Sequence, residues 1–479
     1  MVSFWLLTSA ICAICVVPTI LNSRRPDFEL ITARNVFVLY CLFQFVLSPL
    51  LVYLGDYTSA GSTPLICFTS DFRQAVRGQA YVTLGIFAFQ WVYWLYTHRH
   101  ALRGIRPPGS ILRIHPRVSQ GLPLVLALTS IISFFYLTQT QGGIAQFLSG
   151  IDDFRNNHLN GTFLLYLGLY CMYFAFVIVY HSYLKDRRHG KLAFVLFVLA
   201  ILIGFLGAYR HLAVETAITA AVMRHYGYKR IALSAKVWLV AVLFACVNMV
   251  YVAFRDTRAD TSVIVSTFQN RPIVDTLYYE FFFRFNGPEA MARIVDVTDA
   301  TGYTGAPYIA ASLATFWVPR SLWADKPYSA TAVANVLFFP ESFDDVREGG
   351  AAAPTVEGTF YWIAGLPGLL IGMAALGALV AFADGLILRR KDLFGFALYA
   401  NFFLMAAFIS EMVDLHVVRF LMRLMLWAVL FLICGQRLCV REESRTVARH
   451  SHGGGSDRPR HRPDRGSSNE EGGWCHESL

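Results

Sequence analysis

Long apolar runs alternate with short polar connections over most of the chain, and their lengths predict membrane-crossing helices. A helix needs about 20 apolar residues to cross about 30 Å of hydrocarbon. Ten runs approach that length, at residues 4–21, 36–54, 79–97, 122–140, 163–183, 192–209, 237–254, 360–383, 393–410 and 417–438. A shorter run, 212–223, is short enough to be re-entrant.

The positions of Lys and Arg indicate whether the short run 212–223 crosses the membrane. Basic residues concentrate in five connections, within residues 24–34, 99–117, 185–191, 224–236 and 389–391. All five fall on one side only if 212–223 crosses, and an excess of Lys and Arg marks the cytoplasmic side. We therefore predict an all-α polytopic protein of the cytoplasmic membrane with about 11 transmembrane helices. Its amino terminus lies outside and its carboxyl terminus in the cytoplasm.

The same pattern predicts four parts. Membrane helices 1–8 occupy residues 1–254, a polar external loop occupies 255–358, and membrane helices 9–11 occupy 359–440. We expect the loop to be mostly helical, because Pro288 suits the first position of a helix and helical periodicity follows it to residue 297. Residues 441–479 are polar and too poor in apolar side chains to fold, which predicts a disordered cytoplasmic tail.

Composition supports a membrane protein and excludes several classes of enzyme. Of 479 residues, 56% are hydrophobic and only 15% are charged, which is unlike a soluble enzyme. The chain has no P-loop, no Gly-x-Ser-x-Gly and no His-Glu-x-x-His motif, which argues against an ATP-driven machine or a zinc hydrolase. Most cysteines lie inside apolar runs without metal-ligand spacing. We expect no metal, no cofactor and no nucleic-acid partner.

One stretch of the external loop stands out. Residues 316–327 read Phe-Trp-Val-Pro-Arg-Ser-Leu-Trp-Ala-Asp-Lys-Pro. The two prolines exclude a regular helix interior, and the two tryptophans, of which Trp323 is the second, favour the membrane–water boundary. The simplest structure is a rigid turn on the membrane surface that presents Arg320 and Lys326. An interfacial loop whose cations meet lipid phosphates explains the same residues.

The pattern Pro-Arg-x-x-Trp-x-x-Lys-Pro in this stretch resembles the oligosaccharide repeat unit polymerases, the O-antigen polymerase (Wzy-type) family. The family pattern continues with a Gly-Glu or Glu-Gly pair just before the next span, and Glu357 and Gly358 take that place. The family often shows Gly-Gly-x-x-x-Phe followed by an arginine, which residues 142–147 and Arg155 match. Where the family shows Gly-x-Arg between close spans, this chain has Gly-Ala-Tyr-Arg ending at Arg210.

The resemblance implies a metal-independent membrane glycosyltransferase of the GT-C type. It would polymerise polyprenyl-pyrophosphate-linked oligosaccharide repeat units into a cell-surface polysaccharide, on the outer face of the cytoplasmic membrane. The implied partners are the lipid-linked oligosaccharide, the bilayer, a flippase and a chain-length regulator. Two alternatives stay open: a transporter or flippase of lipid-linked oligosaccharides, and a glycan ligase.

That chemistry has two demands. The departing pyrophosphate needs its charge met, which arginine does well through bidentate hydrogen bonds, and the attacking hydroxyl needs a base, for which a partly desolvated carboxylate is suited. The candidate catalytic residues are therefore Glu357 as base, His416 as the alternative base, and Arg320. The candidate substrate-binding residues are Arg210, Arg255, Arg284, Lys326 and Trp323, although Arg284 lies in an aromatic run where a cation–π contact is an equal explanation.

Other ionisable residues at membrane depth are also candidates, because burying charge there is costly. Glu215 and His211 lie one helical turn apart on the same face, which predicts a local ion pair or a functional group beside Arg210. A second group lies between the last two spans and consists of Glu411, Asp414, His416 and Arg419. That group either lines the same cavity as the external loop or forms a plain polar turn.

Overall fold

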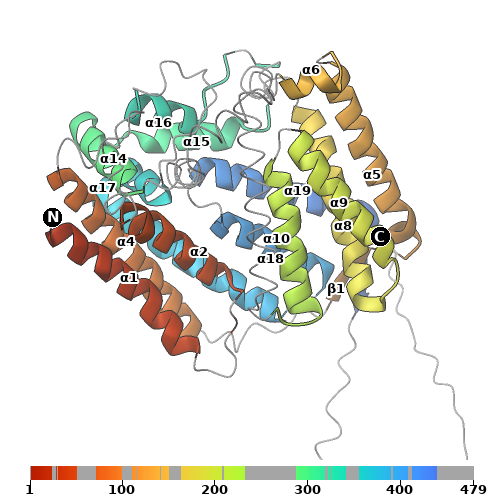
Figure 1. Cartoon of the computed structure of the whole chain (residues 1–479), viewed down its shortest axis with the longest axis horizontal. Helices are drawn as coiled ribbons and strands as arrows, with labels where there is room; N and C mark the ends of the chain where they lie inside the picture. Colours follow the sequence, from red (N-terminus) through yellow and green to blue (C-terminus); the bar gives the residue numbers. More distant parts are fainter. Residues whose placement is uncertain are drawn as a thin grey trace, which may run out of the picture.

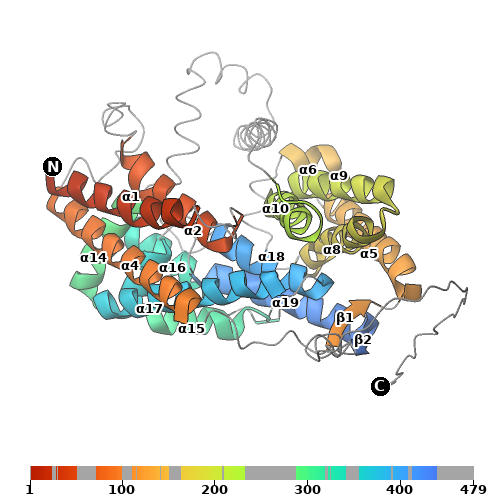
Figure 2. The same ribbon diagram turned by 90° about the horizontal axis from the view of Figure 1, so that it is seen from below.

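The computed structural model describes residues 2–23, 29, 31–50, 72–99, 110–114, 116–140, 142–149, 163–207, 210–231, 287–318, 322–323, 325–340, 355–389, 392–407 and 413–439. At some of these positions, including Arg210 and His416, only the backbone is described. Helices dominate, and Figures 1 and 2 show them arranged in two groups with a smaller layer at one end.

The first group contains the amino-terminal helices and the longest late helix. Its members are α1 (Val2–Ser23), α2 (Ala33–Leu42), α4 (Phe72–Arg99) and α17 (Val356–Arg389). A π-helical segment, η1 (Phe43–Leu47), continues α2. In Figure 1 these helices run side by side, with α17 along α4. The group buries aromatic side chains such as Phe37 and Phe89, whose ring centroids lie 4.0 Å apart.

The second group contains α5 (Pro116–Gln139), α6 (Ile144–Ser149), α8 (Phe163–Asp186), α9 (Gly190–Leu206) and α10 (Arg210–Gly227). Two late helices, α18 (Leu393–Ala407) and α19 (Val413–Cys434), complete the bundle. Helix α18 contacts both α2 and α10, so it joins the two groups. Trp427 of α19 is buried against Phe174 of α8, with ring centroids 4.8 Å apart.

Three helices from the predicted external loop form the smaller layer, which we call the outer layer. They are α14 (Gly287–Thr301), α15 (Gly305–Thr315) and α16 (Ala330–Phe338). The helix predicted to open at Pro288 begins one residue earlier, at Gly287. Figure 1 shows the outer layer at the end of the first group where α17 begins, and α14 and α15 contact α17 there.

Length and composition confirm that the chain is a helical membrane protein. Within the described residues, five helices are long and apolar enough to cross a membrane: Val2–Ser23, Ala33–Leu50, Gly121–Gln139, Leu167–Asp186 and Val356–Leu388. Shorter apolar helices cover Gly190–Leu206, Leu393–Ala406 and Phe420–Leu432. The predicted span 237–254 lies outside the described residues, and the total of eleven spans stays a prediction.

A short two-stranded sheet was not predicted from the sequence. Strand β1 (Ser110–Ile114) pairs antiparallel with β2 (Gly435–Cys439), with Ser110 opposite Cys439 and Ile114 opposite Gly435. The last predicted span, 417–438, therefore ends as a helix at Cys434, where Gly435 disfavours helix continuation. The pairing places the connection around residue 110 beside the end of the last helix, and both had been predicted to lie on the same side.

Helix α17 is broken near its amino-terminal end. Ala364 and Gly365 have non-helical backbone angles, and the φ of Gly365 is +64°, a conformation that favours glycine. Pro367 follows and has no N–H with which to continue the helical hydrogen bonds. A Cβ at Gly365 would lie only 2.9 Å from Cε1 of Tyr303. The helix thus consists of two segments, 356–363 and 366–389, and Glu357 belongs to the shorter one.

Candidate functional site

Glu357 lies in the first turn of α17 and its side chain is fully buried. Thr355 caps this turn, because its Oγ1 accepts a hydrogen bond of 3.1 Å from the backbone N–H of Gly358. The Thr359 hydroxyl donates to the Thr355 carbonyl at 3.1 Å. The sequence pattern predicted a span that begins at residue 360, just after Glu357. The helix begins earlier, at Val356, so Glu357 lies within it.

Neither carboxyl oxygen of Glu357 has a hydrogen-bond partner among the described residues. The Thr355 hydroxyl and the Glu357 backbone N–H lie close enough to stabilise the carboxylate, although neither reaches it with the distance and angle of a full hydrogen bond. Tyr40 and Cys41 of α2 lie close enough to interact electrostatically with the carboxyl, and the buried Tyr40 hydroxyl also lacks a partner in the described part of the chain. Buried polar side chains nearly always find partners, so this pair of unsatisfied groups marks a candidate site.

Close packing by glycines seals the site. A Cβ at Gly358 would overlap Ile294 of α14, and a Cβ at Gly287, where α14 begins, would overlap Gln44 and Phe45 of η1. Small residues allow helices to approach closely in membrane proteins. The π-helical geometry of η1 occurs at this contact, and such segments are frequent at functional sites. The first turns of α14 and α17 are therefore held against the outer end of α2.

A polar contact network joins α4, α14 and α17 at the same end. The Tyr361 hydroxyl donates to Asp299 Oδ1 at 2.8 Å, and Arg77 forms an ion pair with Asp299 through Oδ2 at 2.5 Å. Tyr81 of α4 stacks on Tyr361 with ring centroids 5.2 Å apart. Asp299 thus connects the end of α14 to both α4 and α17.

Trp362 fixes the short segment of α17 to the rest of the outer layer. Its Nε1 donates to the Thr304 hydroxyl at 3.2 Å, and its ring stacks on Tyr308 of α15 at 5.7 Å. Phe338 of α16 meets the same buried indole edge-on at 5.4 Å. Helices α15 and α16 therefore contact the short segment of α17 through Trp362, and α14 contacts it through Asp299 and Tyr361.

The turn with the two prolines is described in part. Lys326 Nζ donates to the Val318 carbonyl at 2.9 Å, and the Lys326 N–H donates to the Trp323 carbonyl at 3.1 Å. These bonds close the turn, so Lys326 contributes to its structure. Trp323 is 41% exposed, and its predicted place at the membrane boundary stays a prediction. Arg320 lies outside the described residues.

The remaining predicted residues are placed only partly. Arg255 and Arg284 lie outside the described residues. Arg210 begins α10 and His416 lies in the first turns of α19, and only their backbones are described. Their approach to Glu357 therefore stays a prediction.

Glu215 forms a buried ion pair that was not predicted. Its Oε1 contacts Nη2 of Arg423 on α19, and both side chains are almost completely buried. Sequence periodicity suggested His211, one turn away, as the partner of Glu215. Arg423 could have been noticed because it lies inside the predicted span 417–438, where an arginine is costly unless paired.

Asp414 connects the outer layer to the last helix. Its two oxygens accept hydrogen bonds from Ser312 of α15 at 2.8 Å and Thr331 of α16 at 3.0 Å, and all three side chains are buried. Asp414 belongs to the charged group that was predicted between the last two spans. Another member of that group, Glu411, lies outside the described residues. Asp414 therefore has a structural role in holding the outer layer.

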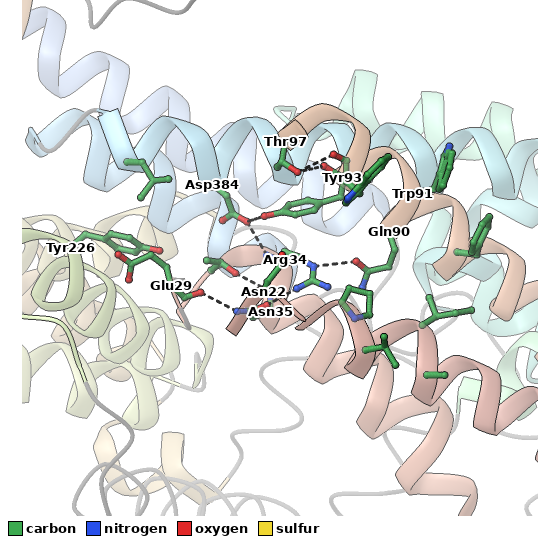
Figure 3. Close-up of a pocket in the computed structure, with 18 residues that line it drawn as sticks. Asn22, Glu29, Arg34, Asn35, Gln90, Trp91, Tyr93, Thr97, Tyr226 and Asp384 are labelled. Carbon is green, nitrogen blue, oxygen red and sulfur yellow. Dashed lines mark hydrogen bonds between the residues drawn. The ribbon is translucent and has the colours of Figure 1, made fainter. Parts of the chain in front are cut away.

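A cavity of about 640 Å³ lies at the opposite end of α17, near Asp384 and Leu388 (Figure 3). It does not coincide with the predicted outer site, which is closed around Glu357. None of its residues had been predicted as a site; Arg34 was noted only as a basic residue that sets orientation. The chain matches no protein-family model, no curated protein and no solved structure.

Proposed function

We propose that the chain is a membrane glycosyltransferase that polymerises polyprenyl-pyrophosphate-linked oligosaccharide repeat units. In this proposal about 11 helices cross the cytoplasmic membrane, residues 255–358 lie on the outer face, and residues 441–479 form a cytoplasmic tail. The product is a cell-surface polysaccharide. A flippase supplies the substrate, and a chain-length regulator is a further partner.

The observation that carries the proposal is the buried, unsatisfied carboxyl of Glu357. It occupies the position of the Glu-Gly pair in the family that the chain resembles, and no described group satisfies it. Desolvation raises the basicity of a carboxylate, and a general base must accept a proton at the moment of attack. A purely structural carboxyl would instead be expected to accept well-formed hydrogen bonds, as Asp414 does from Ser312 and Thr331.

The proposed reaction transfers the growing glycan between carriers. The bond between its anomeric carbon and the pyrophosphate oxygen breaks, and the pyrophosphate leaves with the electron pair. A hydroxyl oxygen of the incoming repeat forms the new bond to that carbon, and Glu357 accepts the hydroxyl proton. His416 is the alternative base. Arg320 and Arg210, with Arg255, Arg284 and Lys326 as further cations, would neutralise the leaving group, so the proposal requires no metal.

The closed packing around Glu357 supports a site that excludes water. Exclusion of water strengthens the electrostatic interactions of a transition state and prevents hydrolysis of the activated glycan. Because the carboxyl is fully buried, the proposed reaction requires the outer layer to move before substrate can reach it. Among the described contacts, α14 and α15 meet the segment 356–363 of α17 through Asp299 and Tyr308, and a movement of these helices would act on Glu357 there.

The phenotype of cells that lack the gene tests the proposed function against its alternatives. Loss of a polymerase leaves single repeats attached to the acceptor, because export and ligation continue. Loss of a flippase or a ligase removes the surface glycan altogether. Gel analysis of surface glycan length, with the gene restored on a plasmid as control, separates these results, and absence of all surface glycan would overturn the proposal.

Arg320 is expected to tolerate neither alanine nor lysine. A pyrophosphate bound by the planar guanidinium needs two parallel hydrogen bonds, which an ammonium cannot provide. The expected loss for either variant is about 3 kcal/mol of transition-state stabilisation, as for removal of one preorganised donor. The measurement is glycan length in cells at matched membrane abundance. Full-length polymer from Arg320→Lys would instead indicate a cation that meets only lipid headgroups.

A further inference from the structure

The cavity at the inner end of α17 contains a buried cation. Arg34 lies in the first turn of α2 and is only 3% exposed. Its Nε donates to Gln90 Oε1 at 3.1 Å, and its Nη1 donates to Thr19 Oγ1 at 3.2 Å and Asn35 Oδ1 at 3.0 Å. Every one of these acceptors is neutral. Its Nη2 has no hydrogen-bond partner among the described residues. Figure 3 shows Arg34 with its hydrogen bond to Gln90.

The nearest carboxylate does not pair with the guanidinium. Asp384 accepts hydrogen bonds from the backbone N–H groups of Ala33 at 2.9 Å and Arg34 at 3.3 Å, and from the hydroxyls of Tyr399 at 2.8 Å and Tyr93 at 3.1 Å. These four donors occupy its acceptor positions, so Asp384 caps α2. The guanidinium itself lies over the Tyr93 ring, 5.6 Å from the centroid.

The other carboxylate at the cavity is also engaged. Glu29 accepts from His225 Nε2 at 2.9 Å and forms an ion pair with Arg230 Nη2 at 2.6 Å. Asp384 therefore interacts with the Arg34 guanidinium only electrostatically, and neither carboxylate in the described part of the cavity accepts a hydrogen bond from it. A buried arginine with an unsatisfied N–H favours an anionic ligand, because phosphate and carboxylate oxygens accept from it strongly.

Much of the remaining wall of the cavity is apolar, although Asn22 and Thr97 also line it. Ala13, Ile14 and Val17 line it from α1, and Phe87 and Trp91 line it from α4. Phe87 and Trp91 stack with ring centroids 6.1 Å apart and are each half exposed. Tryptophan on an exposed face near a helix end is typical of the membrane interface. The cavity thus has a polar end, where Arg34 lies beside the engaged carboxylates of Asp384 and Glu29, and an apolar wall between two helices.

We propose that this cavity binds an anionic phospholipid, with the phosphate at Arg34 and an acyl chain between α1 and α4. A phosphodiester satisfies the guanidinium, and a hydrocarbon chain covers the apolar wall. Basic pockets between membrane helices on the cytoplasmic side are suited to such headgroups. A free phosphate shares the headgroup chemistry but leaves the apolar wall bare. The lipid site is separate from the glycan site and does not depend on the proposed function.

Lipid binding to the purified full-length chain in neutral detergent tests the site. Fluorescent phosphatidylglycerol is titrated, and unlabelled phosphatidylglycerol, phosphatidylcholine and inorganic phosphate compete. Phosphatidylglycerol should compete best. Arg34→Gln, which keeps a hydrogen-bonding side chain without the charge, should weaken its binding about fivefold, the effect of one cation near a lipid surface. Equal competition by phosphatidylcholine, or displacement by inorganic phosphate alone, would overturn the proposal.

A second pair of variants decides the result if Arg34→Gln does not fold. Val17→Trp fills the apolar part of the cavity and leaves its polar end unchanged. Leu21→Trp is the matched control, since Leu21 lies one turn later on α1, is 58% exposed against 50% for Val17, and does not line the cavity. Val17→Trp should reduce phosphatidylglycerol binding about fivefold or more, with no change for Leu21→Trp. Equal binding by both variants would exclude a lipid from this cavity.

Discussion

Glu357→Gln is expected to reduce glycan polymerisation by about 10²–10⁴-fold, the usual cost of losing a general base, without destabilising the protein. Glutamine keeps the size of the side chain and its capacity to hydrogen-bond, but it does not accept the hydroxyl proton. Because the Glu357 carboxyl is buried without a described partner, its neutral replacement removes a source of instability. The free energy of unfolding should stay constant or rise by about 1 kcal/mol.

Purified protein with a synthetic lipid-linked repeat provides the activity measurement, and thermal unfolding in detergent provides the stability measurement. Glu289→Gln is the matched control, because Glu289 is a buried acid of α14 outside the proposed reaction. It should leave turnover close to that of the wild type. Near-normal turnover by Glu357→Gln would transfer the role of base to His416, and a loss of both stability and activity would assign Glu357 a structural role.

Arg423→Met is expected to destabilise the protein by about 3–5 kcal/mol, as removal of one partner from a buried ion pair does. The substitution leaves the Glu215 carboxylate in the bundle without its arginine. The double variant Glu215→Leu with Arg423→Met should recover most of that stability, because apolar side chains of similar volume often replace a buried pair at little cost.

A double-mutant cycle on thermal unfolding in detergent measures the coupling between the two residues. The single variants should each unfold at lower temperature than the double variant. If Arg423→Met alone is as stable as the double variant, the two side chains are not coupled. Glycan length at matched membrane abundance adds a separate result, since a structural pair should leave polymer length unchanged in the double variant.

Features that depend on local sequence could be predicted. Apolar runs predicted helices that the structure contains, including α8 and α4, because the bilayer requires length and apolar surface from each helix separately. Pro288 predicted the start of α14 to within one residue, because its fixed φ suits a first turn. The assignment of Glu357 as a base came from the family resemblance and stays a prediction, and its burial could not be predicted from the sequence.

Features that depend on partner choice could not be predicted. Glu215 pairs with Arg423, which is 208 positions away, and Asp384 caps a helix that begins 351 positions earlier. The local periodicity of the sequence does not indicate which distant residues will become partners. The break in α17 is different, because Gly365 and Pro367 were visible within the run 360–383. Mean hydropathy registers how apolar a run is and does not register its backbone angles, so the run was predicted as one helix.

The break in α17 has a mechanical consequence. Backbone hydrogen bonding makes an intact helix stiff, and the interruption at Ala364 and Gly365 makes a hinge between two stiff segments of α17. The shorter segment contains Glu357, and Tyr361 and Trp362 attach this segment to the outer layer. A displacement of those helices would swing the carboxyl while residues 366–389 stay fixed in the bundle.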